Sequence, residues 1–157
     1  LAGAVRHLVG DATGEQAAAD PVLQDLLGLC EPGYERKRIK QFLIESLVLV
    51  PAGARLITAA DPGVGEVLQH SQELADQSLR NQVPQTRLMV SLAREMGAVG
   101  ASSFGAGWGG SVYALVPTDD AEDFASQWLQ AYRDREQEAE LSSTIVTRPG
   151  TGACRML

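Results

Sequence analysis

The sequence has few of the features that mark a membrane, secreted or nucleic-acid-binding protein. Its two cysteines, Cys30 and Cys154, lie far apart with no metal-type spacing, which favours reduced thiols in a cytoplasmic protein. Basic residues number 13 against 20 acidic ones, and a net charge of −7 without a basic stripe argues against nucleic-acid binding. No window approaches the roughly eighteen uninterrupted apolar residues of a membrane span, so we expect none.

The start of the chain also lacks a signal peptide, because Leu1 opens an alanine-rich segment with neither a basic region nor a long apolar run. We therefore expect an excised piece of a longer protein. The 157 residues, of which 45% are hydrophobic, suffice for one domain with its own core, so 1–157 is expected to be a single domain.

Apolar residues recur at helical spacing over most of the chain. They predict a weak helix over 1–9 and further helices over 21–29, 32–50, 61–79, 84–96 and 119–132. The apolar stripe of the 32–50 helix comprises Ile39, Phe42, Leu43, Leu47 and Val50. Pro51, which lacks a backbone donor, is expected to end or kink that helix.

Polar residues on these helices give weaker signals. Arg36, Lys37, Arg38 and Lys40 could meet an anion, but a solvated helix face is the favoured interpretation. His70 has no second ligand and no acid or base partner nearby in sequence, so a plain structural histidine is favoured over a catalytic one.

Two β-like runs, over 98–104 and 111–116, follow the 84–96 helix, and further strand-like segments cover 144–147 and 153–157. On the last helix, Phe124 and Trp128 stand four residues apart and are expected to pack against the sheet. This order predicts an α+β fold, a two-layer sandwich with a small antiparallel sheet backed by helices.

The stretch from Gly105 to Gly110, with four glycines in six residues, joins the two β-like runs. Its backbone can adopt positive φ and expose amides, which suits a phosphate; a tight hairpin turn explains the glycines equally well. No Lys-Ser/Thr follows, so it is not a Walker loop. It also lacks the strand, GxGxxG and helix order of a Rossmann loop.

The stretch GAVGASSFGAGWGGSVYALVP, residues 97–117, resembles the third conserved motif of the GHMP kinases, and the galactokinase branch is the most similar. Residues that fall on the pattern are Gly97, Ala98, Gly100, Ala101, Gly105, Ala106, Gly107, Gly109 and Gly110, with Trp108 where phenylalanine is usual. The resemblance implies the ferredoxin-like C-terminal domain of such a kinase, with the N-terminal catalytic domain outside this chain.

Three departures from the galactokinase pattern stand out. Ser102 and Phe104 occupy positions where galactokinases usually show a basic residue and a threonine, and Gln72 takes the histidine position of a Ser-His-x-Ser-Leu pattern. The third is that the sugar pocket, the main phosphate loop and the catalytic aspartate of the family have no counterpart in this chain.

The resemblance implies a cytoplasmic sugar kinase that uses ATP and Mg²⁺, with no nucleic-acid or membrane partner. Its implied nucleotide-phosphate contacts are Gly105, Ala106, Gly107, Gly109 and Gly110, whereas catalytic residues and metal ligands are expected outside this chain. The alternatives are a family member acting on another sugar or a uronic acid, and a non-catalytic relative that senses a ligand.

Overall fold

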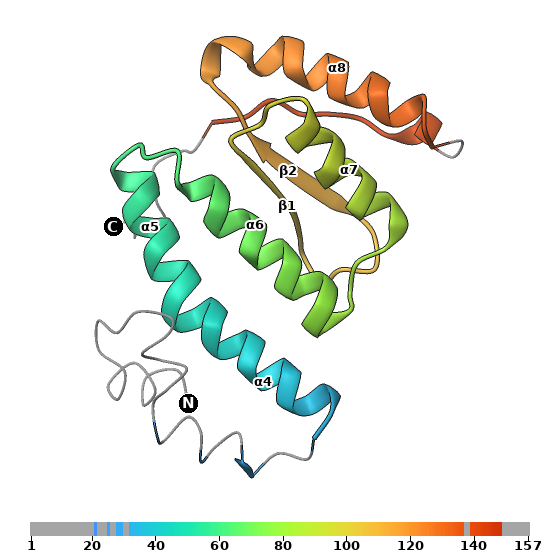
Figure 1. The fold of residues 1–157 in the computed structure, drawn as a ribbon. Coiled ribbons are helices and arrows are strands. Elements are labelled where there is room, and N and C mark those ends of the chain that lie inside the picture. The colour runs from blue at the N-terminus through green and yellow to red at the C-terminus, as the bar shows by residue number, and fades with distance from the viewer. Residues whose placement is uncertain (1–20, 22–24, 26–27, 30–31, 137–138, 149–157) are drawn as a thin grey trace, which may run out of the picture.

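A computed structural model describes residues 21, 25, 28–29, 32–136 and 139–148. In chain order the elements are α4 (Tyr34–Ile44), a π-helical turn (Glu45–Leu49), α5 (Val50–Thr58), α6 (Val64–Leu74), a second π-helical turn (Ala75–Leu79), α7 (Pro84–Glu95), β1 (Gly100–Phe104), β2 (Ser111–Leu115), a 3₁₀ turn (Thr118–Asp120), α8 (Ala121–Arg133) and a 3₁₀ turn (Ala139–Leu141). These elements form an α+β fold with a small antiparallel sheet backed by helices, as predicted (Figure 1).

Some of the expected features lie outside the described residues: the helix over 1–9, both cysteines, the strand over 153–157 and most of the helix over 21–29. In the last of these, the Leu29 N–H donates to the Asp25 carbonyl at 3.1 Å, as in a helix.

The core lies between the sheet and helices α7 and α8. Ala101 pairs with Ala114 in the antiparallel register, and Ala101 is 1% exposed. Buried residues of the same cluster are Val90, Leu92, Ala93, Trp128 and Tyr132, with Phe124, Val112 and Ala114 packed against them. The Trp128 indole donates to the Met89 carbonyl at 3.0 Å, so its polar end is satisfied inside the core. The predicted burial is confirmed for Trp128, whereas Phe124 is only half-buried against the same cluster.

Helix α6 lies alongside β1, on the side away from β2 (Figure 1). Two glycines allow this approach: a Cβ on Gly65 would overlap the Val99 carbonyl oxygen, and one on Gly100 would lie 2.9 Å from Gly65 Cα. The Ser103 N–H donates to the Gln72 side chain at 2.9 Å. Helix α6 thus lies at the edge of β1 where a further strand could pair, and the Gln72 side chain accepts a hydrogen bond from the β1 backbone there.

The prediction of a strand over 144–147 is wrong. No strand is assigned there, and no backbone hydrogen bond joins this segment to another described residue. Ile145 is 87% exposed. β-branched composition favours extended backbone, but a strand also needs a ladder partner, and none of the described elements supplies it.

Pro51 does not end the helix that precedes it, because α4, the π-helical turn and α5 run on without a break from Tyr34 to Thr58. The Val50 N–H donates to the Glu45 carbonyl, one residue further back than in an α-helix. Pro51 therefore follows a turn of wider register and falls in the first turn of α5, where a missing N–H is tolerated.

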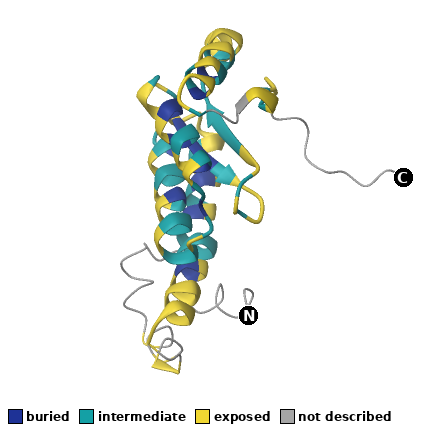
Figure 2. Cartoon of the chain, turned by 90° about the vertical axis from the view of Figure 1, so that its right-hand side faces the viewer, coloured by how far each residue is buried: buried dark blue, intermediate teal, exposed yellow. Residues whose placement is uncertain are grey.

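The expected apolar stripe of this helix is buried only in part. Leu43 is buried and Leu47 half-buried, but Phe42 is 44% and Val50 60% exposed. Val50 follows the π-helical turn, whose extra residue rotates it away from the face that Leu43 occupies. Figure 2 shows the exposed first turns of α4, and the basic residues there are all exposed, as expected for a solvated face.

By length and composition alone this 25-residue helix is able to cross a membrane, with a mean hydropathy of 1.3 over its most apolar window, of which 17% is buried. Core helices of globular proteins pass the same test, so the expected absence of a membrane span stays a prediction.

Candidate functional site

The loop Gly105–Gly110 connects β1 and β2 in the backbone geometry that its glycines make possible. Positive φ occurs at Gly105 (87°), Gly107 (86°), Gly109 (114°) and Gly110 (97°). Trp108 shares this conformation at 58°, which costs a residue with a side chain about 1–2 kcal/mol. The predicted order of helix end, strand, loop and strand is confirmed, and the glycines serve the hairpin directly.

Most amides of this loop have no acceptor within the part of the chain that the structure describes. The Trp108 N–H is the exception, because it donates to the Asn81 carbonyl at 2.6 Å. The five residues implied as phosphate contacts, Gly105, Ala106, Gly107, Gly109 and Gly110, are therefore brought together with amides that have no acceptor among the described residues. Such an arrangement can bind an anion without a charged side chain.

Asn81 is the residue of this site that the sequence did not single out. Its side-chain Nδ2 donates to the Ala106 carbonyl at 3.2 Å, and its carbonyl accepts from Trp108. Its own N–H donates to the Ala75 carbonyl at 3.4 Å, and its Oδ1 accepts from Gln82 at 3.0 Å. The sequence offered only the loss of helical period before Pro84, which indicated a break and nothing more.

Gln72 links Asn81 to the sheet through a buried polar network. The Gln72 Oε1 accepts from the hydroxyls of Ser102 and Ser103, both at 3.1 Å, and from the Ser103 N–H. Its Nε2 donates to Gln82 at 3.1 Å, and Gln82 donates in turn to Asn81. Among the described residues, no buried side-chain nitrogen or oxygen lacks a partner. The network runs from β1 to the glycine loop without an ionised group.

Tyr113 lies across the ladder from Ser102 and close to Phe104, with 5.9 Å between the two ring centroids. Burial, and then the Glu45 carboxylate, raise the pKa of the Tyr113 phenol above its ordinary value of 10.0. The phenol is therefore neutral at physiological pH and does not serve as a base.

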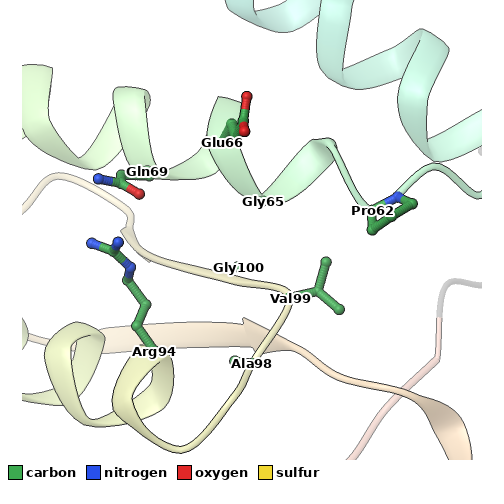
Figure 3. Close-up of a pocket in the computed structure, with 8 residues that line it drawn as sticks. All are labelled: Pro62, Gly65, Glu66, Gln69, Arg94, Ala98, Val99 and Gly100. Carbon is green, nitrogen blue, oxygen red and sulfur yellow. The ribbon is translucent and has the colours of Figure 1, made fainter.

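Two hollows border these elements. A cavity of about 320 Å³ lies between α6 and the start of β1, with Glu66 and Arg94 among its lining residues (Figure 3). It sits at the opposite end of β1 from the glycine loop. A larger groove of about 1320 Å³ is bordered by Trp108, Gly109 and Gly110, and it extends along β2 and α8 to residues 141–148. Of the two hollows, the larger groove is the one that the loop borders.

Fold and site together define a class of protein: an α+β domain whose hairpin loop presents glycine amides that have no acceptor among the described residues. Residues 62–134 match the family described as GHMP kinases C terminal, a segment that runs from α6 to the end of α8. This segment is therefore similar to the C-terminal domain of GHMP kinases, the family that the glycine motif indicated.

The curated relatives are galactokinases. The one from Mycobacterium tuberculosis strain H37Rv is 28% identical over 154 residues, which cover 92% of this chain and 42% of the relative. That of Mycobacterium bovis strain BCG Pasteur is 27% identical, with 95% and 45% covered, and that of Candida parapsilosis 29% identical, with 85% and 27% covered. The chain thus spans less than half the length of the relatives it matches.

Proposed function

We propose that this chain is the C-terminal domain of a galactokinase-like sugar kinase, which transfers the γ-phosphate of ATP to a sugar hydroxyl in the cytoplasm. The family match and the galactokinase relatives support this proposal. Residues 1–157 form one domain, and an N-terminal domain outside this chain supplies the sugar pocket and the catalytic residues. The relatives are more than twice as long as the matched segment, which leaves room for such a domain.

The glycine loop is the part of this chain that acts in the reaction. Its contribution is to hold the nucleotide phosphates with the amides of Gly105, Ala106, Gly107, Gly109 and Gly110. The observation that carries this role is the combination of positive φ, unpaired amides and attachment to Asn81. Phosphoryl transfer depends mainly on positioning and on stabilising charge at the phosphoryl oxygens, so rigid amides are a sensible contribution from a domain that carries no base.

Mg²⁺ does not fit the residues present here. The loop contains no carboxylate, and within the described ranges no group of three or more His, Cys, Asp or Glu side chains gathers where an ion could bind. Magnesium prefers carboxylate oxygens together with substrate phosphates. The ligands that hold the ion are therefore assigned to the proposed N-terminal domain, together with the catalytic base.

The proposed substrate is galactose, with another hexose or a uronic acid as the alternative within the same family. Three residues depart from the galactokinase pattern and favour testing that alternative: Gln72, Ser102 and Phe104. The main sugar pocket is assigned to the proposed N-terminal domain.

An ADP-release assay tests the proposed function. The longer protein that contains this chain, supplied with Mg-ATP, is offered galactose, glucose, mannose, galacturonate and glucuronate in parallel. We expect sugar-dependent ADP release with one of them, and none from the 157-residue chain alone. A longer protein that binds ATP and sugar but releases no ADP would instead be a ligand-sensing relative.

A further inference from the structure

We propose that Asn81 is a positioning residue for the glycine loop: it holds the loop from one side, so that the free amides face the other. The positioning itself stands on contacts within the chain. Only the expectation that the positioned amides contact the phosphates of ATP rests on the proposed function.

Asn81 attaches to the loop at two points on either side of Gly107. Its side chain binds the Ala106 carbonyl at 3.2 Å, and its own carbonyl binds the Trp108 N–H at 2.6 Å. Two hydrogen bonds that flank one residue fix both the position and the orientation of the peptide units between them. They also offset the strain of Trp108, whose left-handed φ persists only when its surroundings impose it.

Gly107 is in close contact with Asn81, whereas the other loop glycines are open. A Cβ on Gly107 would lie 2.5 Å from both Nδ2 and the carbonyl oxygen of Asn81. A Cβ on Gly105, Gly109 or Gly110 would meet nothing within 4 Å. Among the described residues, the loop is therefore closed against Asn81 at Gly107 and open at its other three glycines.

Asn81 is itself firmly placed. It follows Arg80, whose left-handed φ of 54° ends the π-helical turn after α6, and its N–H closes that helix end on Ala75. Through Gln82 and Gln72 its side chain is tied to Ser103 of β1. The position of the loop is thus fixed by contacts to the end of α6 and to the sheet, and not by its own flanking residues alone.

An aspartate at position 81 would disturb this arrangement while keeping the shape of the side chain. Its carboxylate oxygen would face the Ala106 carbonyl in place of the donating Nδ2, so that two acceptors oppose each other. Asn81→Asp therefore tests the donor, and Asn81→Ala tests the side chain as a whole. Gln127→Glu makes the same amide-to-carboxylate change at an exposed position on α8 and is the control.

The two tryptophans provide the measurement. Trp108 is 71% exposed in the loop and Trp128 is 7% exposed in the core, so a chain labelled with 5-fluorotryptophan reports loop and fold separately by ¹⁹F NMR. The Trp108 resonance is assigned by its loss in Trp108→Phe. In both Asn81 variants we expect the Trp108 resonance to shift or broaden while the Trp128 resonance stays in place, and Gln127→Glu to change neither.

Unchanged Trp108 resonances in both Asn81 variants would overturn the proposal. Loss of both resonances together with a lower thermal midpoint would overturn it too, because Asn81 would then support the whole fold. Adding Mg-ATP separates the two proposals. If ATP at millimolar concentration shifts the Trp128 resonance of the unsubstituted chain and leaves that of Trp108 in place, the phosphate-binding role fails. The positioning role is decided by the ligand-free comparison alone.

Discussion

Gln72 and Ser102 are hydrogen-bonded to each other, with 3.1 Å between Oε1 and Oγ, and both are buried. Each of them stands where the galactokinase pattern has a different, ionisable residue. The two departures therefore form one local unit, in which an uncharged amide and an uncharged hydroxyl satisfy each other. A neutral pair avoids the cost of burying charge, and reverting only one partner would place an ionisable group in a site built for neutral ones.

Replacing Gln72 by alanine is expected to lower the free energy of unfolding by about 1–3 kcal/mol, because the Ser102 hydroxyl and the Ser103 N–H lose their acceptor inside the domain. Gln69→Ala removes an amide one turn earlier that bonds only to Glu73, and serves as the control. Urea denaturation measures both. Equal midpoints for the two variants would mean that the network does not stabilise the fold.

Replacing Trp128 by alanine is expected to destabilise the domain by about 3–5 kcal/mol, because it empties a packed site between α7 and α8 and removes the bond to Met89. Trp108→Ala changes the same residue type at an exposed position and is expected to change stability by about 0.5 kcal/mol or less. Thermal unfolding followed by circular dichroism compares them. A Trp128 variant as stable as the Trp108 variant would contradict this packing.

Alanine at Gly107 is expected to be more disruptive than alanine at Gly109. Both positions have positive φ, which costs about 1–2 kcal/mol in either variant, but only the Gly107 variant places a Cβ against Asn81. In the longer protein, which we propose to be a kinase, Gly107→Val is further expected to raise the Michaelis constant for ATP or to abolish activity. Similar stabilities for the two alanine variants would show that Asn81 moves away without cost, and unchanged kinetics in a folded Gly107→Val kinase would leave the glycine only a structural role.

Tyr113 makes the free energy of unfolding depend on pH in the alkaline range. Burial raises the pKa of its phenol above the unfolded value of 10.0, with Glu45 adding to the shift. The folded state thus favours the neutral phenol, a contribution that is fully present below pH 10 and is lost as the pH rises through the folded pKa. We expect the free energy of unfolding to fall less steeply above pH 10 in Tyr113→Phe than in the unsubstituted chain. Parallel slopes in urea titrations between pH 8 and 11 would contradict the raised pKa.

The sequence predicted most of the local structure around the site. The helix beginning at Pro84, the stop at Gly97 and the hairpin around the glycines all follow from signals within a few residues, and the structure contains all three. Wrong predictions arose where the outcome depends on neighbours in space. The 144–147 segment has strand composition but no ladder partner, and Pro51 is tolerated because of a π-helical turn that no local pattern announces.

The role of Asn81 depends on contacts between segments far apart in the chain. Its partners Ala106 and Trp108 lie 25 and more residues away, so no spacing within the 80–84 stretch indicates the contact. Gly107 was recognisable as part of a glycine motif, but the close approach of Asn81, which requires glycine there in addition to the positive φ, was not. Sequence alone predicted the loop and left its support undetermined.

The role of the loop in binding nucleotide phosphates is tested most directly by an NMR titration of the ¹⁵N-labelled chain with Mg-ATP. We predict weak binding, because half a cleft covers only part of the ligand. Shifts should be confined to the amides of Gly105, Ala106, Gly107, Gly109 and Gly110, and sodium chloride at equal ionic strength should not reproduce them. Shifts centred on any other element would contradict the phosphate-binding role. Micromolar affinity for ATP, or measurable ADP release by the chain alone, would contradict the assignment of the rest of the site to another domain.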